Sequence, residues 1–430
     1  MQIIRYGDKD FEARLAEAWA ASSLWDPAIE ERTRSILDAV RTRGDAAVLE
    51  LTEKFDGARL QAAELAVTAA ERMTASLQAD DDLRQAVREV LKNVAAFARR
   101  SRRKDWQMRN AHGAVVGEKF DPFQRVGIYI PGGKAPLIST ALMTIPLAKA
   151  AGCPEIVVCT PCDREGRIHP GLLYAACVAG ATEIYRVGGA QAIAAMAYGT
   201  STIRPVQKIF GPGNAYVVTA KRLLVGVVSI DLLPGPSEVL VLADDTADPK
   251  LAAADLLAQA EHGSGHERIW LVTTSVRVLR SVERELRKQV QRLDRRAAME
   301  TVLERNAWLI LVRDLAQAVQ ITNRLAPEHC EVMTRQPAHL ARDIRTAGAI
   351  FLGRWSPTVL GDYVAGPSHT LPTGGAGRSF AGLTVDQFQR RTSVVMYDRI
   401  SLRRALPTVR QMAQREGLLA HARSAELRLE

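Results

Sequence analysis

The stretch Val-Gly-Ile-Tyr-Ile-Pro-Gly-Gly at 126–133 decides the fold. Its first five residues form a β-rich run, and the Pro-Gly-Gly that follows predicts a turn before a helical segment at 141–151. Because strands and helices continue to alternate, we expect right-handed βαβ units and a parallel sheet covered on both faces, wound like half of a dinucleotide-binding fold. Further strands are expected at 155–159, 183–187, 208–210 and 228–232.

The segments on either side of this stretch predict helices before it and a second α/β region after it. Asp26-Pro27 is a helix start, because aspartate caps a helix and proline suits the first helical position. A helix restarting at Gly44-Asp45 and a longer one over 69–100 are expected next. Beyond residue 238 the alternation resumes, with helices at 251–262, 276–293 and 315–325 and strands at 269–273, 308–312 and 349–352. After residue 382 the chain is expected to be mostly helical.

The composition is that of an ordinary globular protein. The chain has 430 residues, of which 47% are hydrophobic and 24% charged, and this favours two or three domains with substantial cores. No run of about 18 apolar residues occurs, so a membrane span is not expected. The N-terminus lacks the apolar stretch of a secretory signal, and five cysteines in so long a chain do not indicate a disulfide framework. A cytoplasmic location is therefore expected.

A cysteine pair and a basic cluster are both better explained by structure than by a binding site. Cys159 and Cys162 have C-x-x-C spacing, but no second pair follows and Cys159 ends an apolar run, so buried unreactive thiols are favoured over a redox or zinc site. The net charge is +9, and basic residues cluster at 99–104. Aromatic residues make up only 5% of the chain and none lies within the cluster, so a solvated helix end is favoured over a nucleic-acid site.

Four widely separated polar residues form a candidate metal-ligand set. Gln259 and His262 are three apart on an expected helix, so their side chains would share a face. Asp362 lies in an expected loop after a strand, and His421 lies on the C-terminal helix. Two imidazoles, a carboxylate and an amide oxygen suit Zn²⁺ or a similar divalent ion. The alternative is that these are ordinary solvent-facing residues. His266 competes as a ligand, but the Gly-Ser-Gly before it favours a loop histidine.

The sequence Ala-Pro-Glu-His at 326–329 supplies a carboxyl group and an imidazole side by side. An imidazole titrates near neutral pH, so His329 suits acid–base catalysis. Neighbouring side chains on a strand or loop diverge, which would let Glu328 serve a different reacting group. The alternative is a surface pair that follows the end of a helix.

Four motifs in this order resemble the histidinol dehydrogenase family, and the similarity runs from about Asp26 to His421. The motifs are Val-Gly-Ile-Tyr-Ile-Pro-Gly-Gly (126–133), Val-Gly-Gly-Ala-Gln-Ala-Ile-Ala-Ala (187–195), Gly-Pro-Gly-Asn (211–214) and Gly-Pro-Ser-Glu (235–238). The resemblance implies two Rossmann-like parallel-sheet α/β domains, one inserted in the other, with helical N- and C-terminal extensions, in an intertwined homodimer. The implied parts are a helical extension at 1–25, a metal-bearing α/β domain of 26–125 plus 238–382, an inserted NAD-binding domain at 126–237, and a C-terminal tail at 383–430.

The resemblance also implies the site residues. Zn²⁺ would be held by Gln259, His262, Asp362 and His421. L-Histidinol would contact Ser237, Gln259, His262, His329, Asp362, His369, Glu416 and His421. NAD would contact Tyr129, Gln191 and Asn214. Glu416 and His421 would be contributed by the tail of the partner subunit, so that each active site would need two chains.

The reaction implied by the resemblance is the oxidation of histidinol to histidine through histidinal, with two NAD reduced, in histidine biosynthesis. His329 would act as the base and Glu328 would activate the water that attacks the aldehyde. Cys330 would point elsewhere and is not expected to be a nucleophile. No G-x-G-x-x-G motif is present, so the nucleotide site is expected at the glycine turns of 187–190 and 211–214.

Two segments differ from the sequences that are common in the family. The sequence Gly-Gly-Lys-Ala-Pro-Leu-Ile-Ser-Thr occupies 132–140, and Leu-Leu-Pro occupies 232–234. Both lie near the expected cofactor domain, so they affect nucleotide contacts more than metal ligands. They leave open a paralogue that oxidises another small polar alcohol, such as a sulfonated propanediol. A metal-binding regulatory protein without catalysis is the alternative from another class.

Overall fold

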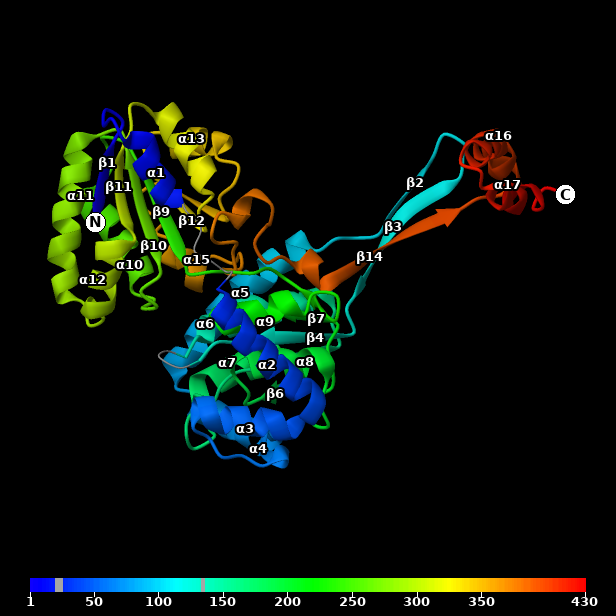
Figure 1. Cartoon of the computed structure of the whole chain (residues 1–430), viewed down its shortest axis with the longest axis horizontal. Helices are drawn as coiled ribbons and strands as arrows, with labels where there is room; N and C mark the ends of the chain where they lie inside the picture. The colour runs from blue at the N-terminus through cyan, green and yellow to red at the C-terminus, as the bar shows by residue number, and fades with distance from the viewer. Residues whose placement is uncertain (20–25, 133–135) are drawn as a thin grey trace.

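The computed structural model describes residues 1–19, 26–132 and 136–430. Residues 20–25 of the expected N-terminal extension, and 133–135 within the motif at 126–133 and the segment 132–140, lie outside the described residues. The described residues form three sheets, arranged as two α/β lobes and an arm that extends away from them (Figure 1). The chain thus has the expected architecture of two parallel-sheet α/β units, and the arm is an addition to it.

The first lobe is built on a five-stranded parallel sheet in the order β6-β5-β4-β7-β8. The alternation predicted from 126 to 232 is confirmed, because a helix follows each of the first four strands. The strands are short, and after a polar first residue each is apolar, as expected of strands covered on both faces. They are β4 (Arg125–Tyr129), β5 (Glu155–Cys159), β6 (Glu183–Tyr185), β7 (Lys208–Phe210) and β8 (Ser229–Ile230). The helices are α6 (Ile138–Ala151), α7 (Pro170–Ala179), α8 (Gly189–Tyr198) and α9 (Ala215–Leu223).

The N-terminal helices also belong to this lobe, which corrects the expected grouping of 26–125 with 238–382. Leu37 and Val48 lie in one apolar core with Ile193 of α8, and Val94 lies in another with Ile145 of α6. Their apolar faces are buried against the helices of the five-stranded sheet, and local patterning does not encode which sheet a helix will cover. These helices are α2 (Pro27–Arg43), α3 (Asp45–Asp56), η1 (Ala62–Glu64), α4 (Ala69–Gln78) and α5 (Asp81–Ser101).

The long helix expected over 69–100 is two helices. The Asp80 carboxylate accepts a hydrogen bond from the backbone N–H of Leu83 at 2.7 Å and so starts α5 as its N-cap. At the other end of α5 the basic cluster begins, and Arg99 and Arg100 are exposed in the last turn. The interpretation of that cluster as a solvated helix end is confirmed.

The second lobe is built on a six-stranded parallel sheet in the order β1-β11-β10-β9-β12-β13. Helices cover both faces, as Figure 1 shows. The strands are β1 (Gln2–Arg5), β9 (Glu238–Ala243), β10 (Arg268–Thr273), β11 (Ala307–Leu311), β12 (His329–Met333) and β13 (Ala349–Leu352). The helices are α1 (Phe11–Trp19), α10 (Pro249–Ala260), α11 (Val276–Gln289), η2 (Val290–Arg292), α12 (Arg296–Arg305), α13 (Leu315–Leu325), α14 (Pro337–Leu340), η3 (Ala341–Asp343) and α15 (Val359–Tyr363).

The N-terminal extension is not purely helical, contrary to expectation. Gln2–Arg5 pairs in parallel with β11 and forms one edge of the six-stranded sheet, with Ile4 fully buried. A strand of four residues with two isoleucines gives too short a pattern to distinguish it from a helix start. Residues 1–19 are therefore part of the second lobe.

The arm consists of an antiparallel three-stranded sheet and two terminal helices (Figure 1). The prediction of a mostly helical chain after residue 382 is wrong for 389–396, which pairs with β3 along its whole length. Strand β14 reads Gln-Arg-Arg-Thr-Ser-Val-Val-Met, and its run of five polar residues resembles a loop unless its distant partner is known. The elements of the arm are β2 (Trp106–Arg109), β3 (Val115–Pro122), β14 (Gln389–Met396), α16 (Arg399–Arg415) and α17 (Leu419–Glu426). The short helices η4 (Ala376–Arg378) and η5 (Val385–Phe388) precede β14 and lie outside the arm, and Val385 and Phe388 are buried in the core of the first lobe.

Two further expectations concern cysteines and membrane segments. All five cysteines are free thiols, with Cys159 buried and Cys162 half-buried, which agrees with the structural interpretation of their C-x-x-C spacing. Within 1–19, 26–132 and 136–430, no helix combines the length and the apolarity needed to cross a membrane.

Candidate active site in the cleft between the lobes

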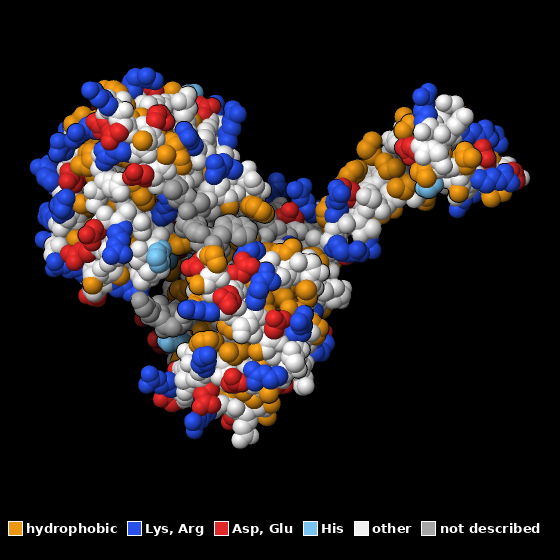
Figure 2. Space-filling view, viewed as in Figure 1, with side chains coloured by type: hydrophobic (Ala, Val, Ile, Leu, Met, Phe, Trp, Pro, Cys, Tyr) orange, Lys and Arg blue, Asp and Glu red, His pale blue; other side chains and the backbone are white. Residues whose placement is uncertain are grey.

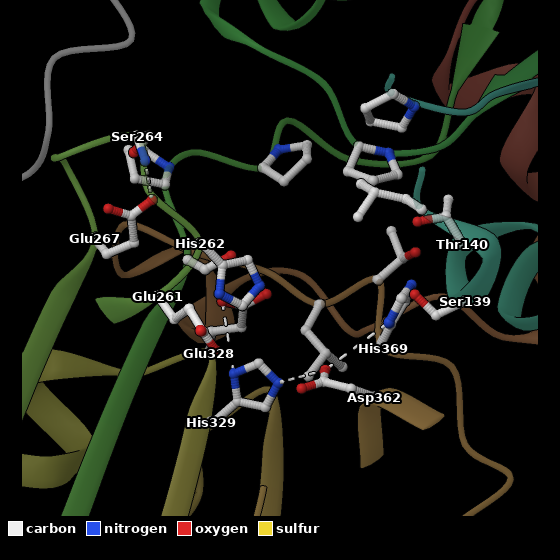
Figure 3. A pocket seen from close by; sticks show the side chains of 18 of the residues that line it. Ser139, Thr140, Glu261, His262, Ser264, Glu267, Glu328, His329, Asp362 and His369 are labelled. Atoms are coloured by element: carbon white, nitrogen blue, oxygen red, sulfur yellow. Dashed lines mark hydrogen bonds and ion pairs between the residues drawn. The ribbon is translucent and has the colours of Figure 1, made fainter. Parts of the chain in front are cut away.

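A cleft of about 750 Å³ separates the two α/β lobes and contains both predicted catalytic residues, Glu328 and His329. The first lobe contributes Ser139 and Thr140 of α6 and the turn after β7, and the connector before β9 contributes Ser237. The second lobe contributes the end of α10, the start of β12 and α15. Figure 3 shows His262, Glu328, His329, Asp362 and His369 around this cleft.

The imidazole of His329 is fixed by the backbone of the neighbouring strand. Its Nδ1 lies 3.0 Å from the carbonyl oxygen of Glu238, the first residue of β9. Since a carbonyl oxygen only accepts, Nδ1 carries the proton and donates it there, which leaves the Nε2 lone pair directed toward Asp362. His329 is only 4% exposed, and burial lowers its pKa. The ring is therefore held neutral, as a base must be before it accepts a proton.

Glu328 is held by the same residue of β9. Its Oε2 accepts a hydrogen bond from the backbone N–H of Glu238 at 2.8 Å and lies 3.6 Å from Nδ1 of His329. Burial raises the pKa of Glu328 well above its usual value, and the carboxylates of Glu238 and Asp362 raise it further. Glu328 and His329 thus both line the cleft, and the alternative of a surface pair is wrong.

Glu238 is the residue that the sequence analysis overlooked. It ends the motif Gly-Pro-Ser-Glu, which was quoted for its resemblance but given no role. Its backbone N–H holds Glu328 and its backbone C=O holds His329, while burial raises the pKa of its side chain to about 7. Any residue type can make these backbone contacts, so the identity of Glu238 did not predict them. The only indication in the sequence was the position of the motif immediately before a strand.

Gln259 and His262 lie together at the end of α10, but not on one helical face as predicted. Helix α10 ends at Ala260, and His262 lies in the turn that follows. The turn folds back, so that Nδ1 of His262 is 3.3 Å from Nε2 of Gln259. Gln259 is buried, and His262 faces the cleft. His266 lies in an exposed loop, as expected.

Asp362 lies between two imidazoles. It belongs to the short helix α15 rather than to the loop that was predicted. Its Oδ1 is 3.9 Å from Nε2 of His329 and 3.8 Å from Nδ1 of His369. Burial lowers the pKa of His369 to about 4, and the Asp362 carboxylate opposes that shift. The predicted substrate contacts Ser237, His262, His329, Asp362 and His369 all line the cleft.

The donors in this cleft suit a divalent cation but do not complete its coordination within one chain. An amide oxygen of Gln259, an imidazole of His262 and a carboxylate of Asp362 are the N/O donors that Zn²⁺ accepts. In the part of the chain that the structure describes, no three His, Cys, Asp or Glu side chains converge closely enough to hold a metal. The donor set therefore fits the ion only if a further ligand comes from elsewhere.

Glu416 and His421 are not brought to this cleft by their own chain. Glu416 caps the end of α16 and His421 lies on α17, at the far end of the arm (Figure 1). Both residues are exposed. The two tail positions remain separate from the other predicted site residues within a single chain.

A second cleft of about 850 Å³ contains the three predicted nucleotide contacts, Tyr129, Gln191 and Asn214. It lies at the carboxyl ends of the five-stranded sheet, where α/β sheets commonly bind ligands. The hydroxyl of Tyr129 accepts a hydrogen bond from the backbone N–H of Gly189 at 3.1 Å. Gln191 is 1% exposed, and neither polar atom of its amide has a partner among the described residues. Such an amide is suited to hydrogen bonding with a ligand.

Helices α2 and α3 form the opposite wall of this second cleft, which the sequence analysis missed. Arg32, Arg43, Lys54 and Asp56 line it. These residues were expected to belong to the metal-bearing domain, so nothing in the sequence indicated that they would lie near a nucleotide. Burial raises the pKa of Asp56 to about 6.

These features define the class of the protein. The protein has two parallel α/β lobes and two adjoining clefts. One cleft is walled by glycine turns, and the other contains a buried base and a buried carboxyl group. This combination is typical of a two-domain α/β enzyme. The comparisons with known proteins identify the family.

The sequence profile of histidinol dehydrogenases matches residues 21–429. A histidinol dehydrogenase of Geobacillus kaustophilus is 46% identical over 93% of this chain and 95% of its own length. One of Heliobacterium mobile is 43% identical over the full length of both chains. The crystal structure of histidinol dehydrogenase from Elizabethkingia anophelis superposes with a TM-score of 0.95 at 33% identity, covering 100% of this chain and 98% of that one. The chain belongs to the histidinol dehydrogenase family.

Proposed function

We propose that this protein oxidises L-histidinol to L-histidine through histidinal, in a zinc-dependent four-electron reaction that reduces two NAD and completes histidine biosynthesis in the cytoplasm. The observation that carries the proposal is the pair Glu328 and His329, buried in the cleft and held by opposite backbone groups of Glu238. Membership of the family supplies the substrate. The remaining steps follow from the chemistry of the residues that line the two clefts.

His329 acts as the base of the first oxidation. Its neutral ring presents Nε2 toward the cleft, so it can accept the proton of the substrate hydroxyl. Asp362, 3.9 Å from Nε2, stabilises the imidazolium that forms. Tyr129, Gln191 and Asn214 would hold NAD in the second cleft, where the bound nicotinamide would supply the hydride acceptor for each oxidation.

Glu328 serves the second oxidation. Histidinal must be hydrated before it can lose two more electrons, and a carboxylate can take a proton from the attacking water. Its buried position makes the ionised form a stronger base than an ordinary carboxylate. Once His329 has released its first proton to solvent, its Nε2 can accept the proton of the hydrate, so one cleft serves both steps.

Gln259, His262 and Asp362 would hold the metal with His421, which the partner subunit would contribute. Bound Zn²⁺ would orient the substrate and polarise its reacting end. In that arrangement Glu416 of the partner subunit would contact the substrate together with Ser237 and His369.

A homodimer that exchanges tails is supported by the surface of the arm. Apolar side chains gather along it in Figure 2. Val395, Ile400 and Leu419 are 65%, 62% and 68% exposed in the single chain. A row of exposed apolar residues on a projecting arm is typical of a surface that another subunit covers.

The decisive experiment measures NADH release from purified protein with L-histidinol, with and without a chelator. We expect two NADH for each histidinol consumed, and loss of activity after metal removal that added Zn²⁺ restores. One NADH per substrate would refute the four-electron reaction. Turnover of a sulfonated propanediol without turnover of histidinol would identify a paralogue, and no turnover of any polar alcohol would favour a regulatory protein.

A further inference from the structure

Lys221 and Asp231 form a fully buried ion pair in the first lobe, outside both clefts. Both side chains are 0% exposed, and Nζ of Lys221 contacts Oδ1 of Asp231. Lys221 lies on α9, and Asp231 follows the last residue of β8. Burying two charges is costly unless they are paired and hydrogen-bonded, so the surroundings of the pair reveal what it holds in place.

The pair binds both backbone groups of Gly211. The backbone N–H of Gly211 donates to Oδ2 of Asp231 at 2.8 Å, and Nζ of Lys221 donates to the Gly211 carbonyl oxygen at 2.9 Å. The other oxygen of Asp231 accepts from the backbone N–H of Leu232 at 2.6 Å. Every oxygen of the carboxylate is thus engaged by the protein itself, and the pair has no surface left for a ligand.

Gly211 begins the turn Gly-Pro-Gly-Asn, and its conformation leaves little freedom. Its φ is +109°, and a β-carbon there would lie 2.1 Å from the carbonyl oxygen of Tyr129. The turn therefore abuts the backbone of Tyr129 at the end of β4. Tyr129 is also tied to Gly189 through its hydroxyl. Tyr129 therefore connects the turn at 211–214 with the loop at Gly189, and both segments line the nucleotide cleft.

The turn lies between the two clefts. Pro212 and Gly213 line the cleft that contains His329, and Asn214 lines the nucleotide cleft. The Oδ1 of Asn214 accepts from the backbone N–H of Tyr216 and Val217 at 3.0 and 3.1 Å as the N-cap of α9. Its amide nitrogen is consequently the part of the side chain that can donate to a bound molecule.

We infer that Lys221 and Asp231 are positioning residues for the nucleotide, holding Gly211 so that the turn presents Asn214 to the dinucleotide at the boundary with the substrate cleft. The inference rests on the proposed function, because it assumes that the second cleft binds NAD. A positioning role differs from a purely structural one because it predicts weaker NAD binding even in a variant whose stability is restored.

A second ion cluster in the same sheet, made of a buried arginine and two partly exposed carboxylates, provides the control. At the amino ends of the strands, Nη1 of Arg125 lies 2.6 Å from a carboxylate oxygen of Glu155 and 2.6 Å from one of Glu183. Arg125 resembles Lys221 in that it is buried and lines neither cleft. Breaking this cluster removes ion pairs of a buried cation at the end of the sheet that faces away from the nucleotide.

The test compares Lys221→Met and Arg125→Met with the full-length wild-type enzyme. We expect Lys221→Met to raise both the Kd for NAD in calorimetry without histidinol and the KM for NAD by at least about tenfold, because small displacements of binding groups are costly. The KM for histidinol should change much less. Arg125→Met should lower the melting temperature while leaving the Kd for NAD unchanged.

A double variant separates folding from positioning. Lys221→Met leaves an unpaired buried carboxylate, whereas Lys221→Met with Asp231→Asn removes both charges and should regain stability. We expect the double variant to melt close to the wild type and still bind NAD weakly. If the affinity for NAD recovers together with stability, or is unchanged in all variants, the positioning role is refuted. The proposed function is not affected by either result. A wild-type protein that binds no NAD would instead refute the proposed function, on which this inference depends.

Discussion

The backbone of Glu238 binds His329 directly, with Nδ1 of the imidazole 3.0 Å from the carbonyl oxygen. A backbone carbonyl does not titrate, so it accepts from Nδ1 whether the ring is neutral or charged, and Nε2 remains the nitrogen that gains and loses a proton. The same residue holds Glu328 through its N–H. The acid–base pair is therefore positioned by the first residue of β9, an interior strand of the six-stranded sheet, and not by another ionisable side chain. The two catalytic roles are consequently separable by substitution.

Replacing His329 by asparagine tests its role as the base. The amide nitrogen of asparagine can still donate to the Glu238 carbonyl, so the fold should persist. Loss of a general base should lower kcat by about 10²- to 10⁴-fold. Steady-state NADH release measures kcat, and thermal melting is the control. A variant with the wild-type kcat would show that another group takes the proton.

The substitution Glu328→Gln should separate the two oxidations. Glutamine can accept the same N–H of Glu238 but cannot take a proton from water. NADH release from added histidinal should fall by about 10²-fold or more, and the first NADH from histidinol should fall much less. Single-turnover measurements with each substrate distinguish the two. Equal losses would contradict the assignment of Glu328 to hydration.

Cys330 should be dispensable for catalysis. It follows His329 on β12, so its side chain points to the opposite face of the sheet, where it is fully buried with Leu240 and Val332. Burial also raises the pKa of its thiol to about 12, far from that of a reactive thiolate. We expect Cys330→Ala to keep most of the activity and to lose about 1 kcal/mol of unfolding free energy. A fall in kcat of about three orders of magnitude would show a covalent role.

The first lobe could be predicted because its strands carry their own signal. Parallel strands buried on both faces are continuous apolar runs, and the turns between them need glycine, as at Gly211. The arm gives no such signal. Thr392 of β14 pairs with Lys119 of β3, more than half the chain away in sequence, and neither segment is apolar enough to stand out. Pairing over such a distance is decided by the whole fold.

The sequence predicted that His262, His329 and Asp362 would lie together, and all three line one cleft, but it did not predict the groups that hold them there. His262, His329 and Asp362 have the chemistry of ligands and bases, and motifs marked them. The contact between Glu238 and His329 joins backbone to side chain across neighbouring strands, and sequence carries no record of it. The same is true of Asp56, whose helix was expected in the other lobe and instead lines the nucleotide cleft.

Mixing two inactive variants tests whether each site is built from two chains. His262→Asn removes a ligand from the cleft, and His421→Asn removes one from the tail. If the tail serves the partner, half of the sites in a mixed dimer carry both substitutions and half carry neither. Co-refolded equal amounts should then recover about a quarter of wild-type activity. His262→Asn mixed with Gln259→Ala, both in the same cleft, is the control that should not recover. No recovery in either mixture would show that one chain supplies the whole site.

The buried acids Asp255 and Glu331 should make stability depend on pH. Burial, followed by the neighbouring Asp255 carboxyl, raises the pKa of Glu331 to about 9, and burial raises that of Asp255 to about 6. Because these values lie above those of the unfolded chain, the folded protein binds the extra protons. The stabilisation is complete at acid pH and is lost as pH rises toward 9.

The substitution Glu331→Gln should remove that dependence. Between pH 7 and 9 the wild type should lose roughly 2 kcal/mol of unfolding free energy relative to Glu331→Gln, since each pKa unit corresponds to about 1.4 kcal/mol. Urea unfolding at several pH values measures the difference. Glu89→Gln, which removes an exposed carboxylate from α5, should follow the wild type throughout. Parallel pH profiles for wild type and Glu331→Gln would mean that Glu331 is ionised in the folded protein, and that another group must then neutralise it.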